Sequence, residues 1–296
     1  MKKLAILAAL TLLAPQITAA NSPCNPDTDG YLQRCIKSME QQLRQLQREK
    51  QTQQAEIQAQ QAEIQALKMR ESLKKGLVAY YPFEGSAHDA SGYGNHGGVY
   101  GATLTVDRFG RSNSAYSFDG DNDCILASDS DSLDIQNSIS LLAWVKTDGS
   151  HQEGAGMIVA KHHSHNARSY ALYDADDAYH KWGWNGKGPR LDLCEPNDVC
   201  HDTSDKRINT GWNFLTGTYD KSSGRMKFYI NAVLVSQNTV GWLDLMQTSV
   251  PLSIGCYLLS SNGSKRRMFF NGRIDDVRIY NRAITPQEIR SLYYQR

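Results

Sequence analysis

The chain has 296 residues, and its 32 Lys and Arg residues nearly balance its 31 Asp and Glu residues, giving a formal net charge of +1. This length allows one or two domains. The balanced charge excludes the basic surface of a typical nucleic-acid-binding protein and the acidic composition of a solvating tail, so we expect no nucleic-acid partner.

Residues 1–20 have the composition of a secretory signal peptide. Lys2 and Lys3 precede an apolar run at 4–13, and small residues at 18–20 offer a cleavage site. The apolar run is shorter than the ~20 residues that a membrane span needs, so we expect cleavage rather than anchoring. We therefore expect an exported protein, located outside the cell, on the cell surface or in the periplasm.

Six cysteines stand at positions 24, 35, 124, 194, 200 and 256. In an exported chain they favour disulfides over metal thiolates, and six cysteines allow about 15 connectivities. Sequence proximity suggests two pairs and leaves a third: Cys24–Cys35, Cys194–Cys200 and Cys124–Cys256. The first pair lies in the segment 21–35 and joins either one chain to itself or two chains.

Residues 36–75 are rich in Gln and contain no Gly, Pro or aromatic residue. Their pattern repeats every seven residues, and seven of the twelve seam positions are apolar: Ile36, Met39, Leu43, Leu46, Ile57, Ile64 and Leu67. This pattern predicts a coiled coil of two or three chains, whose polar seam residues lower stability but help to set the register. The alternatives are a single solvated helix and a disordered Gln-rich linker.

From residue 76 onward, short apolar or alternating runs are separated by turn-rich pieces, which predicts a β-sandwich or a β-barrel. The expected strands are 77–83, 115–118, 124–127, 139–147, 157–161, 170–173, 212–219, 226–236, 252–257 and 269–280. One helix is expected to close the chain. Thr285 at its N-cap, Pro286 and Glu288 form the pattern of a capping box.

Seven segments resemble the laminin-G-like, concanavalin A-like jelly-roll family: GLVAYYPFEGSAHDASGYGNHGGVYGA (76–102), SAYSFDGDNDCILA (114–127), SISLLAWVKT (138–147), WNFLTGTYD (212–220), MKFYINAVLV (226–235), LSIGCY (252–257) and FNGRIDDVRIYNRAITPQEIRSLY (270–293). The resemblance covers 76–296. It implies an all-β, concanavalin A-like jelly-roll sandwich of two antiparallel sheets, here preceded by an N-terminal α-helical coiled coil. It also implies a module of bacterial extracellular proteins. Because this fold hosts both glucanases and lectins, it does not name a function.

The resemblance further implies a structural calcium ion near the loop 88–97. Calcium takes six to eight oxygen ligands, and the candidate ligands are Asp89, Asn95, Asp275, Asp276 and Glu84. Because neighbouring side chains on a strand point to opposite faces, one member of the Asp275–Asp276 pair is expected to face the interior. The alternative to calcium is an ion pair of that carboxylate with Arg273 or Arg278.

Two cysteines depart from the family pattern. Cys124 stands where the family usually has an aromatic residue, and Cys256 stands where it has a residue other than cysteine. The paired change implies a disulfide between two strands. A bridge that closes a loop of ~130 residues stabilises a fold by several kcal/mol.

The segment 148–211 departs freely from the family pattern, so we expect any new specificity to lie there. Trp182 and Trp184 share a strand face, and exposed aromatic rings suit stacking on sugars or burial at a protein interface. Asn185 and Asp174 are near in sequence and offer groups that bind hydroxyls. The alternative is that one or both tryptophans belong to the core.

The sequence contains no clear catalytic set. A retaining glycosidase needs two carboxyl groups about 5 Å apart, and those of this fold carry a Glu-x-Asp-x-Glu strand. Residues 76–296 contain four glutamates, none of them in that motif: Glu84, Glu153, Glu195 and Glu288. We therefore expect no enzyme, with catalysis by Asp as the open alternative.

These observations predict a secreted, non-catalytic binding or adhesion module, with a glycan as its preferred ligand. Calcium is expected to stabilise it, and residues 36–75 are expected to join two or three copies. The alternative is a structural or protein-binding component of the cell envelope, whose partner is a cell-surface protein rather than a glycan.

Overall fold

The computed structural model describes residues 30–148, 151, 153–163, 167–175, 188–196, 199–203 and 206–295. It divides the chain into two compact units, Met1–Leu67 and Lys68–Arg296. In the described residues, no helix is both long enough and apolar enough to cross a membrane. The predicted signal peptide and Cys24 lie outside the described residues.

The described part of the first unit consists of helix α1 (Tyr31–Lys74), which continues into the second unit. The predicted helical segment is therefore confirmed, and it begins five residues earlier than expected. α1 buries none of its residues within the chain, and its seven apolar seam residues are 46–62% exposed. The coiled coil itself stays a prediction, because it needs a second chain.

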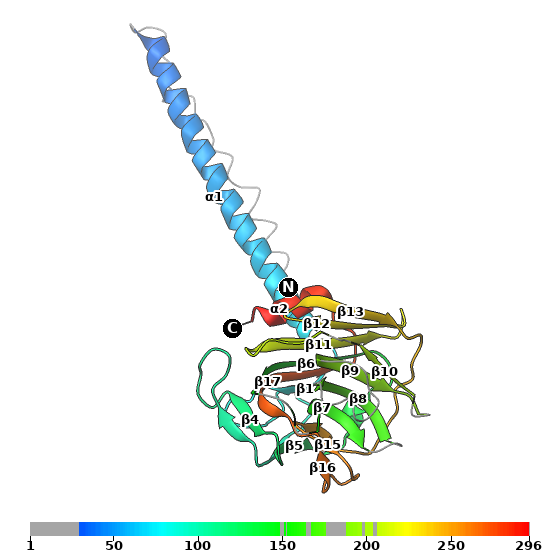
Figure 1. Ribbon diagram of the computed structural model, residues 1–296. Coiled ribbons are helices and arrows are strands. Elements are labelled where there is room, and N and C mark those ends of the chain that lie inside the picture. The colour runs from blue at the N-terminus through cyan, green and yellow to red at the C-terminus, as the bar shows by residue number, and fades with distance from the viewer. Residues whose placement is uncertain are drawn as a thin grey trace. The chain divides into compact units, whose positions relative to one another are not determined.

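The second unit contains two sheets (Figure 1). The first sheet has the strand order β13 (Val233–Thr239), β12 (Arg225–Ile230), β11 (Asn213–Asp220), β6 (Ile139–Thr147), β17 (Asn271–Tyr280), β4 (Ala115–Asp119) and β3 (Thr103–Thr105), and β1 (Leu77–Tyr81) also pairs with β17. All of these pairs are antiparallel.

The second sheet has the strand order β10 (Cys200–Thr203), β9 (Gly188–Cys194), β8 (Ala167–Ala175), β7 (Ala155–His163), β14 (Leu252–Ile254), β5 (Cys124–Ala127) and β2 (Gly97–Tyr100). The short strands β15 (Tyr257–Leu258) and β16 (Arg266–Arg267) pair with each other. β15 also forms the one parallel bridge among the described strands, to β7. The predicted all-β sandwich of two antiparallel sheets is thus confirmed.

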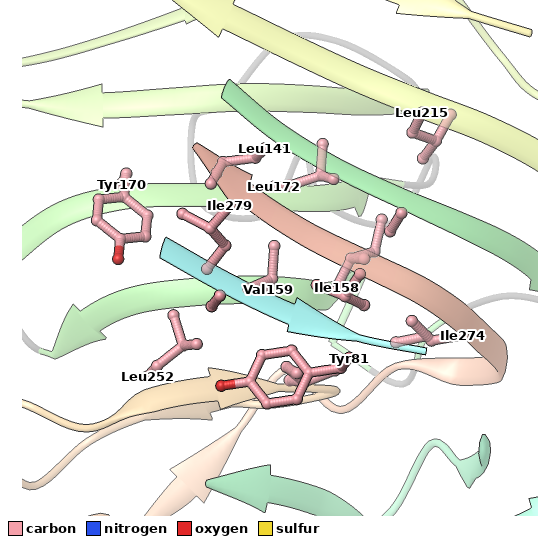
Figure 2. Close-up of a cluster of buried hydrophobic side chains, with 14 of the residues drawn as sticks. Tyr81, Leu141, Ile158, Val159, Tyr170, Leu172, Leu215, Leu252, Ile274 and Ile279 are labelled. Atoms are coloured by element: carbon pink, nitrogen blue, oxygen red, sulfur yellow. The ribbon is translucent and has the colours of Figure 1, made fainter. Parts of the chain in front are cut away.

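The main core lies between the two sheets. Alternate residues of each strand point inward, so that Leu141 and Ile279 of the first sheet meet Ile158, Tyr170 and Leu172 of the second (Figure 2). The Tyr170 hydroxyl donates a 3.0 Å hydrogen bond to the carbonyl of Leu133 in the 3₁₀ helix η2 (Asp131–Leu133). A buried hydroxyl is thereby satisfied, as an apolar core requires.

Helix α2 (Pro286–Tyr293) covers part of the outer face of the first sheet. Its Ile289 and Leu292 pack with Leu142 and Trp144 of β6. The predicted capping box is present, because the Thr285 hydroxyl accepts from the Glu288 amide and the Glu288 carboxylate accepts from the Thr285 amide.

Two strand predictions need correction. The run 226–236 is not one strand but the hairpin of β12 and β13, because Asn231 and Ala232 adopt positive φ values of 51° and 62° and turn the chain. The expected strands also did not include β2, β3, β9, β10 and β16. In β9, Arg190 and Asp192 alternate with the buried Leu191 and Leu193. Because charged residues occupy one face of such a strand, a search for apolar runs does not detect it.

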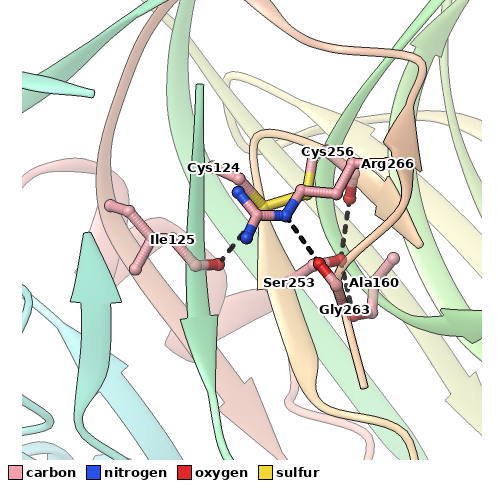
Figure 3. Close-up of a disulfide and its surroundings, with 7 residues drawn as sticks. All are labelled: Cys124, Ile125, Ala160, Ser253, Cys256, Gly263 and Arg266. Carbon is pink, nitrogen blue, oxygen red and sulfur yellow. Dashed lines mark hydrogen bonds between the residues drawn. A yellow bond between two sulfur atoms is a disulfide. The ribbon is translucent and has the colours of Figure 1, made fainter. Parts of the chain in front are cut away.

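The disulfides Cys124–Cys256 and Cys194–Cys200 are both present, as expected from the sequence. The first joins β5 to the turn that follows β14, with 5.4 Å between the Cα atoms. Beside it, the Ser253 hydroxyl bonds the carbonyls of Ala160 and Cys256 (Figure 3). The bridge closes a loop of 132 residues, for which chain entropy gives a stabilisation of about 5 kcal/mol.

Candidate functional site

Asp89, a predicted calcium ligand, organises its own loop. One carboxylate oxygen accepts from the backbone amides of Tyr80 (2.9 Å) and Ser91 (2.8 Å). The other accepts from the Ser91 hydroxyl (2.8 Å) and from the Asn95 amide (3.0 Å). Four donors therefore surround this buried carboxylate, which explains its burial without a metal ion.

Asn95, the second predicted ligand of this loop, is also saturated. Its side-chain nitrogen donates to the Val78 carbonyl and to the Ser132 hydroxyl, both at 2.9 Å. Its side-chain oxygen accepts from the Ser130 hydroxyl at 2.6 Å. These bonds attach the loop to β1 and to the segment that contains η2.

The Asp275–Asp276 pair departs from the expected strand geometry. A bulge interrupts the pairing of β17 with β6 between Asp275 and Arg278, and Asp276 has a φ of 55°. The two carboxylates therefore do not point to opposite faces. Both are buried, at 1% and 6% exposure, and both contact the same guanidinium group, that of Arg108.

Arg108 lies 2.7 Å from an Asp275 oxygen and 3.4 Å from an Asp276 oxygen. Its guanidinium group also faces the Trp144 ring, 4.7 Å from the ring centroid. Arg278 contacts the second Asp276 oxygen at 3.0 Å. The sequence analysis offered an ion pair with Arg273 or Arg278 as the alternative to calcium, and Arg278 does form one. The principal partner of both carboxylates is Arg108, which lies in a loop distant in sequence.

Burial and the neighbouring Asp276 carboxylate raise the pKa of Asp275 to about 7, against the opposing effect of Arg108. Glu84, the fifth predicted ligand, lies apart from this pair. It is exposed and contacts Arg111 at 3.5 Å. The group formed by Arg108, Asp275, Asp276 and Arg278 is called the buried ion network below.

The five predicted ligands do not fit one calcium ion in this arrangement. Guanidinium groups occupy the carboxylates of the buried ion network, and backbone amides occupy Asp89, where a cation would need free oxygens. Within the described residues, three side chains that could bind a metal ion lie close together: His162, Asp192 and Cys194. Since Cys194 is disulfide-bonded, that group does not offer a thiolate either.

The predicted ligand contacts Trp182, Trp184 and Asn185 lie outside the described residues. Asp174 is described, at the end of β8. Its carboxylate lies 3.5 Å from the His151 ring nitrogen, and it is 9% exposed. Asp174 is therefore a buried partner of His151 rather than an open ligand contact.

An open polar groove lies elsewhere in the second unit. Its first lobe is a pocket of about 280 Å³ lined by Val78, Tyr93, Asp131, Ser132, Asp134, Ile135, Gln136, Asn137, Gln247 and Asn281. Four of these side chains are amides and two are carboxylates. Tyr93 is 59% exposed, so much of its ring is available for contact.

The second lobe, of about 420 Å³, is lined by Gln136, Pro196, Asp244, Leu245, Met246 and Gln247. Gln136 and Gln247 line both lobes, so the two lobes adjoin. Pro196 lies between Cys194 and Cys200, which a disulfide joins. We call the two lobes together the polar groove.

Buried and half-buried lysines hold the residues of the polar groove in place. Lys161 is fully buried on β7, and its ammonium group lies 2.8 Å from Asp134 and 2.6 Å from Asp129. Lys161 also donates to the Thr248 carbonyl, one residue beyond Gln247. Three acceptors satisfy the three donors of one ammonium group, which links both walls of the first lobe.

Lys221 makes the corresponding link on the surface. It donates 3.0 Å to the Asn137 side chain and also binds Asp244, so it connects the two lobes. Sequence reasoning did not identify the polar groove, because its residues come from six separate stretches of the chain: 78, 93, 131–137, 196, 244–247 and 281. The one sequence signal was the polar run 129–138, which lies directly before the strongest predicted strand.

A family model described as the concanavalin A-like lectin/glucanases superfamily, Laminin_G_3, matches residues 118–290. The chain belongs to this family. The laminin-G-like resemblance predicted from the sequence is therefore confirmed. A comparison with curated proteins finds no match.

Several solved structures are similar to this chain in fold. Domain 4 of AbnA, a GH43 extracellular arabinanase from Geobacillus stearothermophilus in complex with arabinotriose, is 22% identical with a TM-score of 0.52, over 73% of this chain and 98% of that chain. The binding domain of Paraclostridial Mosquitocidal Protein 1 is 16% identical with a TM-score of 0.57, over 75% of this chain and 52% of that chain.

The binding domain of Botulinum Neurotoxin DC in complex with SialylT is 14% identical with a TM-score of 0.53, over 74% of this chain and 51% of that chain. The present chain thus spans about half the length of the toxin chains that it matches. At these identities the likeness shows the fold alone. Together with the family match it identifies a concanavalin A-like lectin/glucanase fold.

Proposed function

We propose that the laminin-G-like domain binds carbohydrate in the polar groove and does so without catalysis. The observation that carries this proposal is the lining of the first lobe. Four amides and two carboxylates can exchange hydrogen bonds with hydroxyl groups, and the exposed Tyr93 ring offers an apolar face. A pocket with a few converging polar groups is the usual form of a small-ligand site.

Two of the structural neighbours support a sugar ligand. The AbnA domain was solved with arabinotriose, and the neurotoxin binding domain with SialylT. The predicted contacts Trp182, Trp184 and Asn185 stay predictions. They would add to the polar groove or form a second sugar site.

The proposal includes export and oligomerisation through α1. Its exposed apolar seam supports a dimeric or trimeric stalk, in which several heads engage one surface at once. Linked heads convert weak single-site affinity into avidity. Calcium is not part of this proposal. The family resemblance implies it, but the predicted ligands do not fit one ion in this arrangement, and a melting comparison in calcium and EDTA tests the binding itself.

The test is binding of residues 21–296 to a broad panel of immobilised glycans, followed by Gln136→Ala and Gln247→Ala variants. Both glutamines line both lobes, so each variant should lose binding at least tenfold. Gln237→Ala, an exposed amide on β13 outside the polar groove, is the matched control and should bind as the wild type does. Unchanged binding in both groove variants would refute the assignment of the site.

The alternative function is binding of a protein partner in the cell envelope. It is supported by the edge strand β13, where Val233 and Leu234 are 63% and 47% exposed and where backbone groups can pair with an added strand. A folded protein that binds no glycan of the panel, but captures a partner in a way that Val233→Asp abolishes, would favour this alternative.

A further inference from the structure

The charged residues that line the polar groove bear on which class of sugar it can bind. Asp131, Asp134 and Asp244 are the carboxylates of its lining. Among the described residues that line the two lobes, none is Lys or Arg. Lys161 and Lys221 contact these carboxylates, yet neither lines a lobe. An anionic sugar would therefore meet carboxylates, while the ammonium groups of Lys161 and Lys221 behind the lining are already paired with Asp134 and Asp244.

The polar groove is also longer than a site for one sugar ring. Its two lobes share Gln136 and Gln247, so one chain of sugars lying across these glutamines would enter both lobes. Lys221 fixes the spacing of the lobes by binding Asn137 on one side and Asp244 on the other. A fixed spacing suits a linear chain, because little ordering is left to occur on binding.

An exposed tryptophan lies next to the far end of this groove in sequence. Trp242 is 79% exposed, whereas Leu243 and Leu245 are both 2% exposed. The alternation places Trp242 and Asp244 together on the side of the segment that faces solvent. Asp244 lines the second lobe, and Trp242 precedes it by two residues in the sequence.

The backbone at Trp242 is held on both sides although its ring is free. The Leu243 amide donates 2.6 Å to the Tyr219 hydroxyl, which in turn donates 3.1 Å to the Gly241 carbonyl. The Gly241 amide donates 3.2 Å to the Gly224 carbonyl. A large apolar ring on a fixed backbone and open to water has the form of a ready stacking surface.

We propose that the polar groove binds a neutral, linear oligosaccharide, whose chain extends from Tyr93 in the first lobe to a stacking subsite on Trp242 beyond the second. This inference rests on the proposed carbohydrate-binding function and adds the charge class, the chain length and the aromatic subsite. Trp242 discriminates between chain lengths, because a single sugar bound in the first lobe does not reach it.

The experiment uses residues 21–296 and isothermal titration with defined probes. The neutral probes are the linear hexasaccharides of arabinose, xylose, glucose, mannose and galactose, each compared with its monosaccharide. The acidic probes are hexagalacturonate and sialyllactose. The variants are Trp242→Ala and, as a matched exposed aromatic residue away from the polar groove, Tyr294→Ala. Thermal melting checks that both variants are folded.

At least one neutral hexasaccharide should bind the wild type more tightly than its monosaccharide does, and more tightly than both acidic probes. Trp242→Ala should weaken the hexasaccharide by about fivefold to tenfold and leave the monosaccharide unchanged, since one aromatic stacking contact is lost. Tyr294→Ala should change neither.

The failures of this inference and of the proposed function are distinguishable. If sugars bind but Trp242→Ala leaves the hexasaccharide affinity unchanged, the stacking subsite is refuted and carbohydrate binding stands. If the acidic probes bind as tightly as the neutral ones, the charge assignment is refuted. If no probe binds the folded wild type, the inference is overturned, and the glycan panel then decides the proposed function.

Discussion

Two regions of the laminin-G-like unit contain several carboxylates. In one region they are buried in ion pairs, and in the other they line an open pocket. In the buried ion network, Asp275 and Asp276 are excluded from water and held by Arg108 and Arg278. In the polar groove, carboxylates and amides face an open pocket of about 280 Å³. The first region uses its charges within the chain. In the second, Lys161 and Lys221 hold part of the lining in place, yet the pocket itself stays open to a ligand.

A pair of neighbouring aspartates in the sequence therefore does not by itself indicate a metal or ligand site. A buried charge is costly unless a partner of opposite charge satisfies it, so the network is committed to the fold. A groove-facing group keeps water, which a sugar hydroxyl can replace at little cost. Substitutions in the two regions should therefore affect different measurements.

The largest effect on stability is expected from Arg108→Met in the buried ion network. It leaves two buried carboxylates without their shared cation, so the free energy of unfolding should fall by about 3–5 kcal/mol. The wild-type pKa of Asp275 is already raised to about 7, and it rises further without Arg108. The loss should therefore be larger at pH 8, where the wild-type carboxylate is ionised and paired, than at pH 5.

Urea denaturation at both pH values measures this prediction. Arg225→Met, an exposed arginine at the start of β12, is the control and should change the free energy of unfolding by less than about 0.5 kcal/mol. Glycan binding of folded Arg108→Met protein should equal that of the wild type. A binding defect without a stability defect would place the network in the ligand site.

The next effect concerns Glu288, a third buried carboxylate that is committed to the fold. Burial alone would raise its pKa, but the Arg282 guanidinium, the Ser72 hydroxyl and the Thr285 amide together lower it to about 2. Its ordinary value is 4.5, so the stabilisation is complete above that pH and is lost as the pH falls toward 2. Glu288→Gln should lower the free energy of unfolding by about 2–3 kcal/mol at pH 7.

Measuring the free energy of unfolding of the wild type and of Glu288→Gln across pH 2–7 tests this direction of pH dependence. The difference between the two proteins should shrink toward zero as the pH falls to 2 and below, where the wild-type carboxylate becomes protonated. A constant difference at all pH values would show that the substitution acts through lost packing or capping rather than through the charge.

A smaller effect on stability is expected in the polar groove. Asn137→Ala removes an exposed amide whose bond to Lys221 lies at the surface, so the free energy of unfolding should change by less than about 0.5 kcal/mol. Affinity for a bound glycan should fall about tenfold, the cost of one or two lost hydrogen bonds. A stability loss as large as that of Arg108→Met would erase the distinction between the two regions.

The smallest effect is expected from calcium. Saturating calcium at 100 times its dissociation constant would stabilise the fold by about 2.7 kcal/mol. Since guanidinium and amide groups occupy the predicted ligands, we expect the melting temperature in calcium and in EDTA to agree within about 1 °C. A melting temperature that rises by several degrees in calcium would contradict the conclusion that the predicted ligands do not fit the ion. It would support the calcium site implied by the family resemblance.

Local sequence patterns determined several features of this protein before any tertiary contact was known. The heptad repeat predicted the helix around Leu43, the Thr285–Glu288 spacing predicted the capping box, and the alternating run 139–147 predicted β6 with its correct bounds. The sandwich of two antiparallel sheets followed from the number of short strands and from the family resemblance. Each of these features depends on neighbours in the sequence or on motifs that recur in order.

Whether a carboxylate is buried in an ion pair or lines the polar groove depends on tertiary contacts. The bulge at Asp276 turned both carboxylates toward Arg108, which lies 167 residues from Asp275 and carried no sequence signal of its role. The polar groove likewise joins η2, the segment after it and the loop that contains Gln247. A charge pair or a pocket depends on distances between segments that are remote in sequence, and residue periodicity does not encode those distances. The sequence therefore determined the sheets, while packing between loops determined which polar residues the fold uses and which it leaves open.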